Sequence, residues 1–382
     1  MSGSPDGEAV LDLGVIRAGD GGRVGPKMAR LGQLASAGWR VPDGYAVTAG
    51  ALEGWLPAPA LAELHRLFST PAVGGAGPAA SAGGLRLSAQ IRQLIEGQSL
   101  PSWLADAVAA AQARLESRSG RGTALRVAVR SSAVGEDGHT ASFAGQYETY
   151  LGVSGIDEVL RHIAKCWASG YSAHALEYRR RFGGSSPLRA QDLAVGVLEL
   201  VDARAAGVAF TLDPVTGDRS RLVVEANWGL GESVVSGQVT PDYWAVERDS
   251  GRILERRVGG KLVWSVLADG GGSVLAPLPA ELAQAPCLSD DEVRYICRRA
   301  AAIEEAEGTP QDVEWAVARD LDVPDSVYFL QHRPETTWAT TTPAAPPPGT
   351  PPASAPASAP APAKSFDPVQ YALRNVFKVP GT

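Results

Sequence analysis

Two strand-like segments, DVEWAVA and VYFLQHR, carry acidic, amide and guanidinium side chains at every second position of a short stretch. Residues two apart on a strand point to the same face. If the two segments form a hairpin centred on residues 322–323, Glu314 faces Gln331 and Asp312 faces Arg333. Carboxylate and amide oxygens suit Mg²⁺ in company with phosphate oxygens, and the arginine would neutralise phosphoryl charge. The alternative is a solvated sheet face with cross-strand ion pairs.

Two further cations stand where the chain is expected to bend. Lys27 follows the Gly-Pro step of RVGPKMARLGQL at the expected start of a helix, and its compact ammonium suits phosphate oxygens. Arg130 ends the apolar run of VAVRSS, and the stretch after it carries Gly135, Gly138 and Gly145. Glycines let backbone amides approach a phosphate closely. Taken alone, each feature has a plainer interpretation: a solvated lysine at a helix start, and an ordinary strand–turn–strand.

The elements that must position these residues change in type along the chain. Apolar spacing predicts helices over residues 51–68 and 86–117, with a loop at 71–84 between them. Residues 190–265 contain the strand-like runs LAVGVLELV, GVAFTL, RLVVEAN and DYWAVERD, separated by turn signals. Ser289 then predicts the N-cap of a helix, because acidic residues fill the turn that follows it.

This order predicts an α+β fold with two lobes, residues 1–190 and residues 191–339. Proline and alanine dominate residues 340–364, a composition that favours an extended, semi-rigid linker. Residues 365–382, SFDPVQYALRNVFKVPGT, are more apolar than a linker but too short to fold alone. We expect a docking peptide for a partner or for the body of this chain, with an incidental tail as the alternative.

The composition indicates which kinds of partner and which cellular compartment the sequence favours. The net charge of −7 argues against a nucleic-acid partner, which needs a basic excess on the protein. No run of eighteen uncharged apolar residues predicts a membrane span, and the first residues lack the basic and apolar regions of a signal peptide. The three cysteines are widely spaced, which favours a reducing, cytoplasmic compartment.

Five blocks, in this order and spacing, carry a resemblance to one family. They are VGPKMARLGQL with GWRVPDGYAVT, VAVRSSAVGEDGHTASFAGQYETYLGV, GVAFTLDPVTGD, VEANWGLGESVVSGQVTPDYW, and QDVEWAV with VYFLQHRP. Together they resemble the ATP-binding N-terminal region of phosphoenolpyruvate synthase and pyruvate phosphate dikinase. Rifampin phosphotransferase and the phenylphosphate synthase subunits share that region. The resemblance covers roughly residues 14–338, and it implies an ATP-grasp fold with ATP held between the two lobes.

The resemblance also implies roles for individual residues. Lys27 and Arg130 would contact the phosphates of ATP, and Arg333 would act on the transferring phosphoryl group, so these three are the expected catalytic residues. Mg²⁺ would lie among three side chains that also contact ATP: Asp312, Glu314 and Gln331. The other implied contacts to ATP are the lid-loop residues Ser142, Phe143 and Gly145, the nearby Thr149, and backbone groups of Glu199 and Leu200 beside the adenine.

Two departures from the family pattern bear on function. Relatives usually carry a glutamine where Leu198 stands, which affects how the base is selected. Full-length relatives continue into a swivelling domain with a phosphorylatable histidine in a G-G-x-[ST]-S-H-like motif. None of the five histidines here has that context: His65, His139, His162, His174 and His332. We therefore expect a separate polypeptide to carry the swivelling phosphohistidine domain and the acceptor site.

The reaction implied by the resemblance converts ATP, a partner histidine and water into phosphohistidine, AMP and phosphate. The phosphoryl group would then pass to a small molecule, such as an aromatic or natural-product hydroxyl. One alternative is a self-contained ATP-grasp kinase or ligase that acts directly on a small molecule. The other is a regulatory module that binds nucleotide without chemistry.

Overall fold

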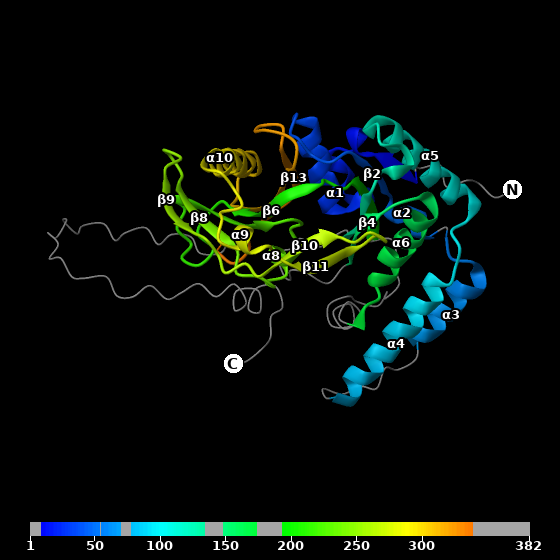
Figure 1. The fold of residues 1–382 in the computed structure, drawn as a ribbon. Coiled ribbons are helices and arrows are strands. Elements are labelled where there is room, and N and C mark those ends of the chain that lie inside the picture. Colours follow the sequence, from blue (N-terminus) through cyan, green and yellow to red (C-terminus); the bar gives the residue numbers. More distant parts are fainter. Residues whose placement is uncertain (1–8, 54, 70–77, 134–147, 174–192, 339–382) are drawn as a thin grey trace, which may run out of the picture.

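Two antiparallel sheets with helices packed on them make up the computed structural model, which describes residues 9–53, 55–69, 78–133, 148–173 and 193–338 (Figure 1). This arrangement confirms the predicted α+β class. None of the helices in the described ranges has the length and apolar character needed to cross a membrane. The residues expected to form the lid loop, the linker and the tail lie outside these ranges.

The first sheet has the strand order β1-β2-β5-β3-β4. One face packs against α1 (Gly21–Ser36), and the other packs against a larger set of helices. Strand β5 shows the alternation, because Val195 and Val197 join the larger core while Leu198 packs under α1. The strands are β1 (Val10–Asp12), β2 (Gly44–Val47), β3 (Val127–Ala133), β4 (Thr149–Val153) and β5 (Leu193–Glu199). The chain leaves this sheet only after β5, whereas the sequence predicted that the first lobe ends at residue 190.

The helices of the first lobe differ from the prediction in their boundaries. The expected loop at 71–84 is wrong in its second half, because a helix already begins at Pro78, where the fixed φ of proline suits a first turn. The expected helix over 86–117 is interrupted between Glu96 and Ser102, at a stretch that contains Gly97 and Pro101. The helices are α2 (Ala49–Glu53), α3 (Ala58–Ser69), α4 (Pro78–Glu96), α5 (Ser102–Ser119) and α6 (Ile156–Ser169), with 3-10 turns at Leu13–Val15, Ala18–Asp20 and Gly122–Ala124. In Figure 1, α3 and α4 lie side by side and extend away from both sheets.

The second sheet has the order β13-β12-β6-β7-β8-β9, and α10 (Asp290–Glu307) covers one of its faces. Ser289 caps α10 as predicted: its hydroxyl accepts from the backbone N–H of Glu292, whose carboxylate accepts in return from the backbone N–H of Ser289. The strands are β6 (Ala203–Phe210), β7 (Arg221–Trp228), β8 (Asp242–Glu247), β9 (Ile253–Arg257), β12 (Gln311–Ala318) and β13 (Val327–Pro334).

A small hairpin, β10 (Val263–Leu267) with β11 (Ser273–Pro277), reaches from the second sheet toward the first. The short helices α8 (Glu232–Val235) and α9 (Ala280–Ala283) flank it. A fully buried ion pair between Lys261 and Asp242 anchors its start, and Lys261 also donates to the carbonyl of Ala285 at 2.8 Å. At the hairpin's turn, a Cβ on Gly152 of β4 would lie 3.1 Å from the backbone nitrogen of Gly272, so the two lobes touch there.

A break in α1 fixes where its second part meets β3. Gly25 has φ +72°, a conformation that an L side chain rarely adopts, and Pro26 follows it. A Cβ on Gly25 would lie 2.2 Å from the carbonyl oxygen of Ser132 on β3. The backbone N–H of Met28 donates to the hydroxyl of the same serine at 3.3 Å. Close backbone contact therefore holds Lys27, between Pro26 and Met28, beside β3.

We expect Gly25→Ala to destabilise the chain more than Gly38→Ala does. Both glycines have positive φ, but no atom lies within 4 Å of a Cβ built on Gly38. The control variant should lose about 1–2 kcal/mol for the left-handed backbone alone. Gly25→Ala should lose a further 1–3 kcal/mol or so, because α1 must move off β3. Urea denaturation of both variants measures the difference, and equal losses would contradict a close α1–β3 contact.

Candidate functional site

The β12–β13 hairpin has the register that the sequence predicts. Asp312 pairs with Arg333 and Glu314 pairs with Gln331, as the hairpin centred on residues 322–323 requires. The guanidinium of Arg333 donates through Nε to Oδ2 of Asp312 at 3.1 Å. A bulge follows Glu314, where the register shifts by one residue. The four side chains therefore lie on the face of the sheet that α10 does not cover.

Arg130 joins this hairpin from the first sheet. It lies on β3 and donates to the side-chain oxygen of Gln331 and, at 3.4 Å, to the carbonyl of Leu330. Since Arg130 and Ser132 are two apart on one strand, Arg130 shares the face on which Ser132 meets the kink of α1. The two sheets thus bring together residues about 200 positions apart in the sequence, and Lys27 lies on the same side of β3.

Unsatisfied polar atoms mark the point where these residues meet. Asp312 is 7% exposed, and its Oδ1 has no hydrogen-bond partner among the residues that the structure describes. The Nε of Arg130 is buried without a partner in the same part of the chain. Buried donors and acceptors are costly unless they are bonded. A carboxylate oxygen and a guanidinium N–H left open together suit a ligand that carries both a cation and anionic oxygens.

Burial also changes the pKa of Asp312. Removal from water raises the pKa of Asp312 to about 6, while the guanidinium of Arg333 opposes the shift and the carboxylates of Glu335 and Glu314 add to it. A divalent cation would relieve that penalty by pairing with the charged form. The described residues contain no cluster of three or more His, Cys, Asp or Glu side chains able to hold a metal. Two carboxylates and an amide fit Mg²⁺ only if the ligand's own oxygens complete the shell.

An apolar floor lies on the same sheet face, nearer the connection between the lobes. We use this name for the buried Ala203, Ala206, Leu230 and Ala316 and the residues packed on them, which are Leu151, Val201, Leu267 and Leu330. Its four buried members are 0–7% exposed, and three of them are alanines. Since β4 contributes Leu151, both lobes pack into this cluster.

At the connection between the lobes, two backbone N–H groups already donate hydrogen bonds within the fold. The N–H of Glu199 donates to the carbonyl of Asp43 at 2.7 Å, and that of Leu200 to the carbonyl of Arg126 at 2.9 Å. These two N–H groups are thus paired within the fold, and the backbone contacts of Glu199 and Leu200 to an adenine stay a prediction. Leu198 is 3% exposed and packs under α1.

The remaining predicted contacts are split between described and undescribed parts of the chain. Thr149 is exposed on β4 directly opposite Arg130 in the register. Ser142, Phe143 and Gly145 lie outside the described residues. One acidic residue of the sheet escaped the sequence analysis: Glu225, which is 7% exposed on β7. Its signal was a charge inside the apolar run RLVVEANW.

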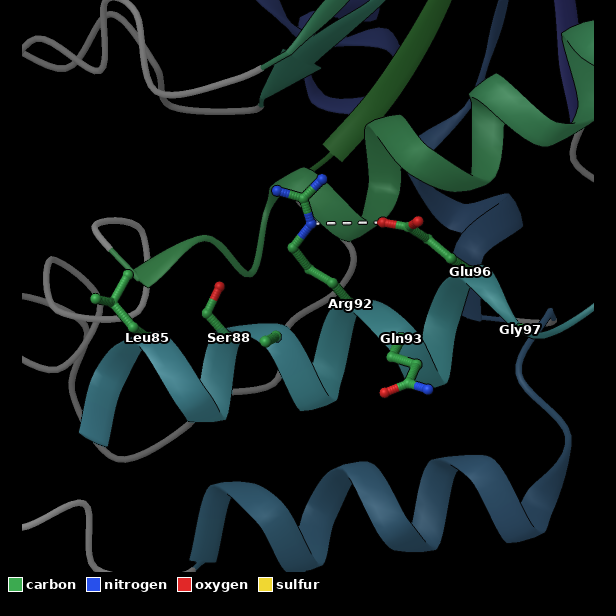
Figure 2. A pocket seen from close by; sticks show the side chains of 7 residues that line it. Leu85, Ser88, Arg92, Gln93, Glu96 and Gly97 are labelled. Carbon is green, nitrogen blue, oxygen red and sulfur yellow. Dashed lines mark hydrogen bonds and ion pairs between the residues drawn. The ribbon is translucent and has the colours of Figure 1, made fainter. Parts of the chain in front are cut away.

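Two hollows differ in their relation to the predicted site residues. One, of about 680 Å³, runs along α4, where Arg92 pairs with Glu96 as Figure 2 shows, and it contains none of the predicted site residues. Arg92 also pairs with Glu148 at 2.8 Å, next to the start of β4. The other, of about 270 Å³, lies at the connection between the lobes and is lined in part by Glu199 and Leu200.

Comparison with known proteins assigns the family. Residues 22–350 match the family described as pyruvate phosphate dikinase, AMP/ATP-binding domain. The chain is 36% identical over 338 residues to a probable phosphoenolpyruvate synthase of Staphylothermus marinus. It is 39% identical over 333 residues to a rifampicin phosphotransferase of a Streptomyces species, and 38% identical over 317 residues to the prodigiosin synthesizing transferase PigC of Serratia marcescens.

These matches cover 83%, 87% and 83% of this chain. They cover only 40%, 36% and 32% of the relatives, so the chain spans well under half of their length. The matched residues include β2 to β5 of the first sheet, the whole second sheet and every described residue of the β12–β13 hairpin. The chain therefore belongs to the family of the pyruvate phosphate dikinase AMP/ATP-binding domain.

Proposed function

We propose that this chain is the ATP-binding, phosphoryl-donating part of a phosphotransferase similar to phosphoenolpyruvate synthase, with an ATP-grasp fold. The observation that carries the proposal is the meeting of Arg130 with the β12–β13 hairpin. Family membership supports ATP as the ligand. The open Oδ1 of Asp312 and the open Nε of Arg130 suit a metal-bound polyphosphate.

Each charged side chain then has a role that its position supports. Lys27, Arg130 and Arg333 would bind the phosphates and offset the negative charge that develops as a phosphoryl group leaves. Asp312, Glu314 and Gln331 would hold Mg²⁺, which when bound supplies further neutralising charge to the phosphate oxygens. Phosphoryl transfer depends mainly on such positioning and charge neutralisation.

The phosphoryl acceptor would come from another polypeptide. Of the two histidines whose side chains are described, His332 is 1% exposed, and its Nδ1 is hydrogen-bonded to Gln311 at 3.0 Å. Burial lowers its pKa to about 4, so it stays neutral inside the fold. His162, the other, lies on α6 with its Nδ1 2.8 Å from the carbonyl of Glu158. We propose that a swivelling domain of a partner supplies the histidine and that a small molecule, such as an aromatic or natural-product hydroxyl, is the final acceptor.

Substitution of Asp312 by Asn should weaken the binding of Mg·ATP. The variant should fold, because it removes a buried carboxylate that lacks a full set of partners. We expect a loss of about 10- to 100-fold in affinity with Mg²⁺, as for a lost charge-assisted contact, and a much smaller change with EDTA. Calorimetry with Asp291→Asn as the control, at an exposed position on α10, measures both. Equal affinities for both variants would contradict a metal role for Asp312.

Transfer to a partner histidine distinguishes the proposal from its alternatives. Mixed with a swivelling-domain protein encoded nearby and ATP labelled at the β-phosphate, the chain should place label on a histidine and release AMP. Arg333→Gln should slow this by about 100-fold or more, because the developing charge loses a donor. Arg319→Gln, at an exposed pair with Asp202, should not. ADP formed by the chain alone would favour a self-contained kinase, and binding without turnover would favour a regulatory module.

A further inference from the structure

The second part of α1 begins as a helix of its own. Gly25 interrupts α1 with φ 72° and ψ 163°, so the helix restarts at Pro26, where the fixed φ of proline suits the first helical position. Gly25 then stands at the N-cap, and Met28 is the third helical residue. The first backbone N–H groups of a helix lack partners within it, and an N-cap side chain accepts from the second or third of them. Glycine has no side chain to do so.

A serine from another strand takes the place of the missing cap. The hydroxyl of Ser132 on β3 accepts from the backbone N–H of Met28 at 3.3 Å, which is the bond that an N-cap side chain makes. A Cβ built on Gly25 would lie 2.3 Å from this Oγ, so the hydroxyl fills the space into which an N-cap side chain would extend. Ser132 is fully buried, and the bond is therefore shielded from water. The start of this helix is fixed by β3 rather than by a cap of its own.

The same strand carries a second cation of the predicted site. Arg130 lies two residues before Ser132 and shares its face of β3. Lys27 and Arg130 also act on one thiol: burial raises the pKa of Cys166, and both cations oppose that rise. Two of the three cations expected to bind phosphate thus depend on neighbouring positions of one strand. Arg130 is held there directly, and Lys27 is held through the hydroxyl of Ser132.

We propose that Ser132 is a positioning residue for nucleotide binding, whose hydroxyl holds the first turn of this helix where Lys27 can reach the phosphates. The inference rests on the proposed function, since it needs the phosphates of ATP beside Lys27. Without the hydroxyl, the N–H of Met28 loses its acceptor inside the fold, and the turn is free to move off β3. The lysine then spends a smaller fraction of the time in the binding geometry, and the affinity for ATP falls accordingly.

Calorimetry with Mg·ATP on a double-mutant cycle tests whether Ser132 acts through Lys27. Ser132→Ala should weaken binding by about 5- to 10-fold, and Lys27→Met by about 30-fold or more, as for a lost contact to a charged group. The double variant should bind as weakly as Lys27→Met alone, to within about twofold, because the hydroxyl has no cation left to position.

The neighbouring serine provides the matched control. Ser131 is 1% exposed and points to the opposite face of β3, where its hydroxyl donates to the carbonyl of Glu148 at 3.4 Å. Ser131→Ala therefore removes a similarly buried hydroxyl from the same strand but leaves the cap of the helix in place. Its affinity for Mg·ATP should stay within about twofold of the wild type, and any small loss should add to that of Lys27→Met.

The dependence of affinity on salt separates positioning from a general loss of stability. Salt screens the attraction between Lys27 and the phosphates, so Lys27→Met should flatten the fall in Mg·ATP affinity as sodium chloride is added. Ser132→Ala should flatten it in the same sense, and Ser131→Ala should keep the wild-type slope. A fold that is only less stable would contain less binding-competent protein but would keep the slope.

The outcomes separate the inference from the proposed function. A wild-type chain that binds no Mg·ATP would overturn the proposed function itself. Unchanged affinity in Ser132→Ala, losses that add to those of Lys27→Met, or a wild-type salt slope would overturn the positioning role alone. The wild type also gives a check that needs neither variant nor nucleotide. Hydrogen exchange at the Met28 amide should be slowed by its bond to Ser132, and exchange as fast as that of an exposed amide would overturn the contact.

Discussion

The pairing register of β12 with β13 is the constraint on which the site depends. A shift of one residue would turn Asp312 and Glu314 into the core under α10 and expose Val313 and Trp315 instead. The hydrophobic core therefore selects the register, and the register places the charges. The bulge after Glu314 lets β13 keep Phe329 on the α10 face on one side of it and Gln331 and Arg333 on the opposite face on the other. Arg130 can then meet Gln331 only because this face of the hairpin looks toward β3.

Three buried acidic residues of the second sheet, Asp242, Asp312 and Glu225, differ in how their charges are balanced. Asp242 accepts from Lys261 and from the backbone N–H groups of Gly259 and Cys287, so its charge is balanced inside the fold. Asp312 and Glu225 are each 7% exposed, and burial raises the pKa of both carboxyls. Asp242 anchors the start of the β10–β11 hairpin through Lys261. The other two carboxyls lower the stability of the fold when they ionise.

Sequence patterns predicted the parts of the structure that local periodicity controls. The β12–β13 register followed from strand alternation and a turn centre, and the N-cap at Ser289 followed from the acidic first turn. The start of α4 at Pro78 was missed, because glycines and a proline read as a loop when packing is not considered. Glu225 was missed for a related reason: a single charge in an apolar run does not show which strands will flank it. The meeting of Arg130 with Gln331 depends on the packing of two sheets and has no local signature.

The contact between Arg130 and Gln331 has a consequence for the order in which ligands enter. In the ligand-free chain the amide oxygen of Gln331 accepts from Arg130, and an oxygen held by a guanidinium repels a second cation. A bare metal ion would therefore meet an incomplete shell of two carboxylates. Under the proposed function, an anionic phosphate would attract Arg130 away from the amide and free its oxygen for the metal. Binding of the metal and binding of the nucleotide would then be coupled through one arginine.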